Sequence, residues 1–364
     1  MAGRSPAPRP GWAGGRLGST GPPIWLAVLA AAVAVAVVVA LVLADPFGGS
    51  GPGDSGSPGG GHAGPAPITT VNPRQAPVPP SHGAYFGAWV KPMLYTQPGR
   101  IAAVTALQRQ IGRRFDIVHT YVRWLEPFPT SSDLAFMRQG STLLLSWGGA
   151  DPRAIVAGTY DGWIRQRASA IKATGKRIFL EWLWEMDRPN LRAKVHSPAD
   201  FIAAWKHIRA IFGQQHVSNV AWVWCPTARG FAQGDAAAFY PGNDQVDWVC
   251  ADVYPGPGPY RSFADTAHAF LAWAAGHPKP VMIGEYGAPQ SYSAAQRAQW
   301  LRAAAQTVRQ DQQVKALVYF DGDPAGRPAA GRYSLTNDLM AIRAFGGIGR
   351  QPYFNPAGLP VGGP

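Results

Sequence analysis

Eight short apolar stretches, spread along residues 84–322, constrain the fold of this chain more than any other feature. They are almost uninterrupted in apolar residues, as strands buried on both faces of a parallel sheet are. Longer amphipathic stretches separate most of them. The predicted strands are 84–90, 115–124, 141–148, 176–185, 219–227, 246–255, 280–287 and 314–322.

The intervening stretches are typical of helices. Clear examples are 100–114, 198–213 and 293–310, where apolar residues recur at helical spacing. Residues 228–245 are short for a full helix and are predicted to be rich in loops. Strands that alternate with helices in this number predict an α/β fold, a (β/α)8 TIM barrel over residues 83–348.

A doubly wound open sheet is the alternative fold. It is disfavoured because no glycine-rich phosphate fingerprint follows the first predicted strand. In a barrel, the chemistry gathers at the C-terminal ends of the strands. Polar residues at those ends are therefore the candidate site residues.

Two glutamates pass this filter. Glu185 ends the fourth predicted strand and Glu285 ends the seventh, so the two carboxyls are expected to face each other across the barrel mouth. A carboxyl pair in a cleft suits hydrolysis of a glycosidic bond, in which one group protonates the leaving oxygen and the other attacks the anomeric carbon. A salt bridge or a rim charge is the alternative for each glutamate taken singly.

Aromatic residues are frequent at the same strand ends. Flat rings bury the apolar C–H faces of sugars well. About half of them must point outward toward the helices, because strand side chains alternate. We expect Trp147, Trp224 and Tyr319 to line the cleft, because they lie close to the ends of their strands.

The ordered motifs "FDIVHTY", "KRIFLEWLWEM", "FIAAWKHIRAIF", "NVAWVWCP", "VDWVCADVY" and "KPVMIGEYG" resemble glycoside hydrolase family 26, the β-mannanase-like group of a retaining barrel clan. The resemblance spans about residues 84–345. It implies that Glu185 is the acid/base and Glu285 the nucleophile, and that Tyr254 holds the nucleophile ionised through a hydrogen bond. It also places His119 and Trp224 among the substrate-binding residues.

The chain departs from the family pattern around the acid/base. Trp184 stands where the family has histidine, Asp187 where it has asparagine, and Glu181 where it has arginine. An apolar neighbour such as Trp184 raises the pKa of a carboxyl, which suits a general acid. Glu181 should point into the barrel, and we expect Arg123 to pair with it, since a buried unpaired carboxylate is costly.

The N-terminal part of the chain has a different composition. Residues 1–23 are basic and are predicted to be cytoplasmic, and the uncharged apolar run 24–44 is long enough to cross a bilayer. A membrane anchor is favoured over a cleaved signal peptide, and both interpretations export the rest. Residues 45–82, rich in Gly, Pro and Ser, are predicted to be a disordered linker, and residues 349–364 a Pro/Gly-rich tail.

The net charge of +12 comes from scattered basic residues. A solvated basic surface is the simplest interpretation, and attraction to anionic envelope polymers is the alternative. The sequence has no basic recognition segment of the kind that binds nucleic acid. It also has no cluster of metal-ligating residues at the spacing of a metal site. Cys225 and Cys250 are interpreted as buried thiols, with a bridge as the lesser alternative.

These features together predict a monomeric retaining β-glycoside hydrolase without a cofactor. It would act outside the membrane on a polysaccharide, a β-mannan or a related β-glycan. The alternative is a barrel that has lost turnover and binds carbohydrate during assembly of exopolysaccharide or cell wall. Retention of both glutamates argues against this alternative.

Overall fold

The computed structural model describes residues 75–362 of the 364-residue chain. Eight parallel strands form a closed barrel in sequence order, each hydrogen-bonded to the next, and the last pairs with the first. This confirms the predicted TIM barrel and the eight predicted strands. The strands are β1 (Tyr85–Val90), β2 (Ile117–Val122), β3 (Thr142–Trp147), β4 (Ile178–Trp182), β5 (Val220–Trp224), β6 (Trp248–Val253), β7 (Val281–Tyr286) and β8 (Val314–Asp321).

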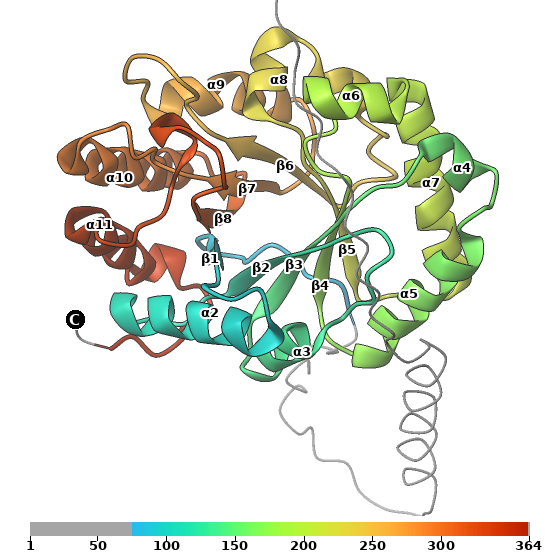
Figure 1. The fold of residues 1–364 in the computed structure, drawn as a ribbon, viewed down its shortest axis with the longest axis horizontal. Coiled ribbons are helices and arrows are strands. Elements are labelled where there is room, and N and C mark those ends of the chain that lie inside the picture. The colour runs from blue at the N-terminus through green and yellow to red at the C-terminus, as the bar shows by residue number, and fades with distance from the viewer. Residues whose placement is uncertain (1–74, 363–364) are drawn as a thin grey trace, which may run out of the picture. The chain divides into compact units, whose positions relative to one another are not determined.

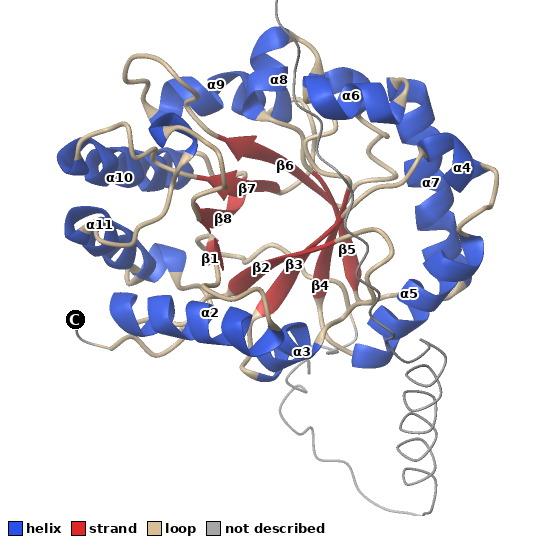
Figure 2. Ribbon diagram, viewed as in Figure 1, coloured by secondary structure: helices blue, strands red, loops and turns tan. Residues whose placement is uncertain are grey.

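The helices form an outer ring around the barrel (Figures 1 and 2). Ser197 and Ser293 cap two of them, because their side chains accept hydrogen bonds from Asp200 N and Gln296 N. The helices are α2 (Gln97–Ile111), α3 (Ser131–Arg138), α4 (Pro152–Val156), α5 (Asp161–Thr174), α6 (Pro189–Val195), α7 (Pro198–Gln214), α8 (Ala228–Gln233), α9 (Phe263–Ala274), α10 (Ala294–Gln310) and α11 (Leu339–Gly349).

Strand alternation divides the core into two layers. One layer lies inside the barrel and includes Ile117, Leu144, Phe179 and Met282. The other lies between strands and helices and holds most of the large aromatic side chains. Each strand contributes to both layers, which explains why the strands are apolar along their whole length.

The two cysteines form a disulfide inside the barrel. Cys225 follows β5, Cys250 lies on β6, and their sulfurs are bonded to each other. The interpretation as free thiols was therefore wrong, although both residues are buried as expected. Sequence spacing does not reveal that neighbouring strands bring the two side chains to the same layer.

A β-bulge in β7 lies directly above this disulfide. Ile283 pairs with Ala251 and Glu285 with Asp252, so Gly284 is an extra residue in the ladder. A Cβ at Gly284 would lie 2.5 Å from Cys250 Sγ and 3.0 Å from Cys225 Sγ. The glycine thus makes room for the disulfide, while the extra residue turns the following side chain toward the barrel mouth.

Both ends of the described chain pack at the strand-start end of the barrel. Ala84 N donates to Tyr353 O (2.9 Å), and buried Arg113 donates to Gly349 O (2.8 Å). The predicted tail therefore lies at the end opposite the strand C-termini. At the same end, Val78 O accepts a bond from Tyr85 Oη (3.0 Å), so the last residues of the predicted linker contact the barrel.

The predicted span 24–44 and most of the predicted linker lie outside the described residues. Within residues 75–362, no helix is both long and apolar enough to cross a membrane. Between β5 and β6, the chain forms α8 and a short 3-10 helix, Ala236–Phe239. This agrees with the loop-rich segment that the sequence predicts there.

The bulge leads to a testable prediction. We expect Gly284→Ala to lower the free energy of unfolding by about 1–3 kcal/mol, because the added methyl overpacks the disulfide layer. Gly213→Ala, on helix α7 with open space around the new Cβ, should stabilise by about 0.5–1 kcal/mol. Chemical denaturation of the two variants measures both effects, and a wild-type value for Gly284→Ala would contradict the packing argument.

Candidate active site

A cavity of about 900 Å³ opens at the C-terminal ends of the strands. Its lining includes both predicted catalytic residues, Glu185 and Glu285. It also includes Tyr254, Trp184 and Asp187 from the predicted support residues. The structure thus brings the carboxyl pair to one pocket, at the end of the barrel where the fold class leads us to expect it.

The backbone after β4 aims Glu185 into the cavity. β4 ends at Trp182, and the chain then takes left-handed conformations at Leu183 (φ 49°) and Glu185 (φ 52°). The Glu185 N–H donates to Cys225 O (2.8 Å), which ties this turn to the end of β5. Non-glycine residues with positive φ are costly and cluster at functional sites. The direction of the Glu185 side chain is therefore set by this turn and not only by the alternation of side chains along β4.

Two tyrosine hydroxyls hold Glu285. Tyr121 Oη donates to Glu285 Oε1 (2.5 Å) and Tyr254 Oη donates to Oε2 (2.7 Å). Burial raises the pKa of Glu285, the charge of Glu185 raises it further, and the two tyrosine hydrogen bonds oppose this rise. Each carboxylate oxygen thus has a donor, which favours the ionised form and fixes its orientation.

Glu185 has a cationic partner. Arg188 Nη1 donates to Glu185 Oε2 from the next turn of the chain. Burial raises the pKa of Glu185, and the charge and hydrogen bond of Arg188 act against that rise. Because burial acts on both glutamates, ionising both at once is unfavourable. The pair therefore retains one proton to a higher pH than isolated carboxyls do.

Glu181 lies under the cavity floor, without the partner that we expected. Arg123 is 90% exposed and contacts Glu126, so the predicted Glu181–Arg123 pair was wrong. Ser146 Oγ donates to Glu181 Oε2 instead. Burial raises the pKa of Glu181 well above its usual range. The neutral, protonated form is therefore favoured, because it loses less hydration on burial than the carboxylate does.

His119 belongs to the same buried group. Its Nε2 lies 2.6 Å from Ser146 Oγ, and burial lowers its pKa to about 3. A neutral imidazole beside a protonated carboxyl forms a hydrogen-bonded network rather than an ion pair. His119 therefore supports the floor from below and is not among the cavity-lining residues.

Asp187 positions a neighbouring loop. Its Oδ1 accepts from Thr227 N (2.9 Å) and its Oδ2 from Thr227 Oγ1. A Cβ at Gly230 would overlap the Asp187 carboxylate, so the first turn of α8 packs directly on it. Asp187 thus fixes the start of α8 at the cavity wall.

Aromatic rings form much of the remaining wall. Trp184 lies 5.1 Å from the ring of Tyr121, Trp89 stacks on Phe320 at 4.5 Å, and Tyr254 stacks on Tyr333 at 4.4 Å between ring centres. The other three predicted aromatics lie elsewhere, in the layer between strands and helices. Trp147 stacks on Trp124, Trp224 packs on Trp273, and Tyr319 donates to Tyr333 O.

Sequence reasoning missed several cavity residues. Strand alternation from His119 indicates that Tyr121 faces inward, and the spacing of Arg188 from Glu185 places it within reach of that carboxyl. Asp252 lies inward on β6 and shares the cavity. No sequence signal marks Tyr333, which arrives on the long loop between β8 and α11.

The barrel interior offers one group of potential metal ligands. Glu181 and the sulfurs of Cys225 and Cys250 lie within 4.8 Å of one another. The sulfurs are bonded together in the disulfide and so do not act as thiolate ligands. These residues do not fit a metal site in this state.

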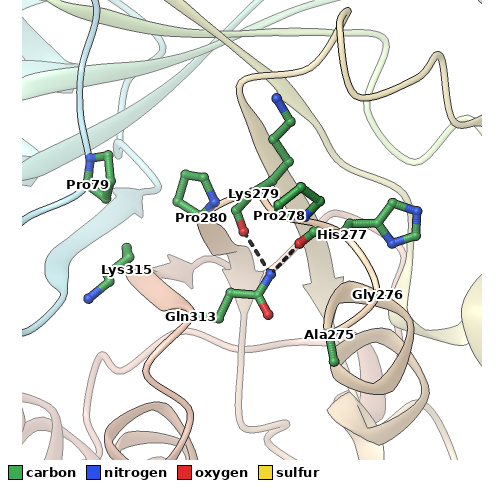
Figure 3. Close-up of a pocket in the computed structure, with 9 residues that line it drawn as sticks. All are labelled: Pro79, Ala275, Gly276, His277, Pro278, Lys279, Pro280, Gln313 and Lys315. Atoms are coloured by element: carbon green, nitrogen blue, oxygen red, sulfur yellow. Dashed lines mark hydrogen bonds between the residues drawn. The ribbon is translucent and has the colours of Figure 1, made fainter.

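A second cavity, of about 560 Å³, lies at the strand-start end (Figure 3). Gln313 Nε2 donates there to His277 O (2.8 Å) and Lys279 O (2.8 Å). Pro79, Lys315 and residues 275–280 also line this cavity. The residues that line it include no carboxylate. It therefore lacks the groups that glycosidic chemistry requires.

Comparison with solved structures supports the resemblance in fold. A GH26 β-mannanase from Bacteroides ovatus matches with a TM-score of 0.57 and 14% identity, over 75% of this chain and 90% of that one. A modular endo-β-1,4-mannanase from Cellulomonas fimi matches with a TM-score of 0.52 and 16% identity, over 74% and 71%. This chain has the fold of family 26 glycoside hydrolases. No family model matches the sequence.

Curated relatives are glycoside hydrolases by name. Endoglucanase H of Acetivibrio thermocellus is 28% identical over 262 residues, and a β-1,3-xylanase of a Vibrio species is 28% identical over 147 residues. These matches cover 65% and 39% of this chain. The aligned regions span only 28% and 30% of the two relatives.

The tyrosine pair leads to a pH prediction. Because Tyr254 lowers the pKa of Glu285, Tyr254→Phe should raise that pKa. Glu285 then ionises only at higher pH, so the acidic limb of kcat/KM should move upward by about one pH unit. Tyr260→Phe, outside the cavity lining, is the control, and an unmoved acidic limb in Tyr254→Phe would show that Tyr254 does not stabilise the carboxylate.

Proposed function

We propose that this chain is a retaining glycoside hydrolase that acts on a β-glycan. One observation carries the proposal: Glu185 and Glu285 meet in one aromatic-walled cavity, and two hydroxyls hold Glu285 ready to act as a carboxylate. The named activities of the relatives, on mannan, glucan and xylan, all fall within this class.

Glu285 is the proposed nucleophile. Its carboxylate attacks the anomeric carbon while Glu185 transfers its proton to the departing glycosidic oxygen, which leaves a covalent glycosyl-enzyme. Glu185, now ionised, takes a proton from water, and the water attacks the anomeric carbon. This step releases the sugar with retained configuration and restores the proton on Glu185.

Arg188 favours the second half of this cycle. Its contact with Glu185 stabilises the carboxylate, the form that must act as base once the glycosyl-enzyme has formed. Burial, and the charge of Asp187, raise the pKa of Glu185 and favour the protonated form that the first half needs. Because these effects on the pKa of Glu185 oppose each other, Glu185 can release its proton in the first step and regain it in the second.

The proposal includes an anchored location. Residues 24–44 would hold the barrel outside the membrane, where a secreted or wall polysaccharide is within reach. The sequence of that run supports this part of the proposal. The protein is proposed to act as a monomer.

Catalytic variants test the mechanism. We expect Glu285→Gln to lower kcat by about 10²–10⁴-fold or more on both polysaccharides and dinitrophenyl β-glycosides. Glu185→Gln should lose a similar factor on polysaccharides but less on the activated glycosides, whose leaving group needs no proton. Glu126→Gln, which lies outside the cavity lining, is the control.

Product analysis gives the stereochemistry. Proton NMR of the first-formed product should show the β anomer, and the α anomer would overturn the retaining mechanism. If Glu285→Gln turns over substrate at the wild-type rate, Glu285 is not the nucleophile. A panel of β-mannan, β-1,3-xylan and β-glucan supplies the substrates.

A second candidate, a barrel that binds glycans without turnover, is favoured by the Arg188 contact. The ion pair with Arg188 opposes the rise that burial causes in the pKa of Glu185, and so works against the protonated form that a hydrolase needs. A 2-deoxy-2-fluoro glycoside with an activated leaving group separates the two. Covalent labelling at Glu285 supports the hydrolase, whereas glycan binding without labelling supports the second candidate.

A further inference from the structure

The cavity separates charge by depth. Its four acidic side chains, Glu185, Asp187, Asp252 and Glu285, are all buried. The charged residues exposed at its rim are Arg229 and Arg327. A ligand that enters the cavity therefore meets cationic groups first and the acids only at the bottom.

The two rim guanidinium groups are free to bind. Among the described residues, neither side chain forms a hydrogen bond or an ion pair, whereas Arg188 at the floor is engaged by Glu185. Arginine presents a planar fork of donors that matches a carboxylate better than an ammonium does. An unpaired pair of such forks at a cleft mouth suits an anionic ligand.

The main chain fixes both arginines in place. Arg327 N donates to Pro324 O (3.2 Å), its carbonyl accepts from Arg332 Nε (2.7 Å), and Gly331 packs against its side-chain stem. Arg229 lies in the first turn of α8, which Asp187 anchors through Thr227. Both guanidinium groups therefore project from anchored backbone.

The positive charge of Arg327 also acts on the catalytic residue Glu185. Burial raises the pKa of Glu185, and the charges of Arg188 and Arg327 both oppose the rise. The same side chain acts on Tyr333, whose pKa burial raises to about 12. Arg327 lines the same cavity as Glu185 and Glu285, so a group bound by Arg327 would lie in the pocket that holds the catalytic pair.

We propose that the substrate is an anionic β-glycan, and that Arg229 and Arg327 bind carboxylates of uronic acid residues beside the scissile bond. The inference rests on the proposed hydrolase function and narrows its substrate class. The aromatic walls receive the faces of the sugar rings, while the rim arginines select the charge. The net charge of +12 favours approach of such a polymer.

Matched pairs of oligosaccharides test the proposal. β-1,4-Linked mannuronate and mannose oligomers share a backbone and differ only in a carboxylate or a hydroxymethyl at C5. C6-oxidised and native β-1,4-glucan oligomers form a second pair. We expect wild-type kcat/KM to be higher by about tenfold or more on the acidic member of at least one pair.

The double variant Arg229→Gln/Arg327→Gln should lose most of this preference, measured as the ratio of kcat/KM between the acidic and the neutral member of each pair. Arg302→Gln/Arg343→Gln is the matched control, since both residues are exposed on outer helices and the net charge changes equally. Added salt should reduce the wild-type preference, because charge recognition at an exposed rim is screened. An undiminished preference in the rim double variant, or a wild-type preference for both neutral members, overturns the proposal.

A binding assay separates this proposal from the hydrolase proposal. If no oligomer is hydrolysed, calorimetric titration with the same pairs still measures recognition. Tighter binding of the acidic member, lost in the rim double variant but not in the control, supports the rim site and rejects turnover. Equal binding of both members, or binding of neither, overturns the rim site.

Discussion

Desolvation of the carboxyl groups governs this site. A carboxylate removed from water is unstable unless donors or a proton replace the lost hydration. The barrel uses both solutions. Tyr121 and Tyr254 donate to Glu285, Arg188 donates to Glu185, and Glu181 beneath them holds a proton beside Ser146. The division of roles proposed for the two catalytic glutamates follows from these different surroundings.

The scaffold beneath the site sets the positions of those groups. The disulfide fills the layer under the bulge, and Gly284 leaves the space that this requires. The extra residue in β7 turns Glu285 inward, while left-handed turns after β4 do the same for Glu185. Two local departures from regular strand geometry thus converge on one cavity.

Particular residues show how far sequence reasoning reaches. The eight strands were predictable because burial on both faces keeps them apolar, and both glutamates followed from their places at strand ends. Trp147, Trp224 and Tyr319 were expected in the cleft but face the helices. Side chains alternate along a strand, so an error of one residue in assigning the inward face moves a side chain to the other layer.

The sequence by itself determined the repeating strand–helix order, the two glutamates and the excess of basic residues, because these depend on local pattern and composition. Tertiary structure decided three further features. These are the disulfide, the pairing of Glu181 with Ser146 and not with Arg123, and the separation of the buried acids from the arginines at the rim. Each of these joins residues from different strands or loops. Such contacts depend on register, bulges and loop paths, which arise only when the barrel closes.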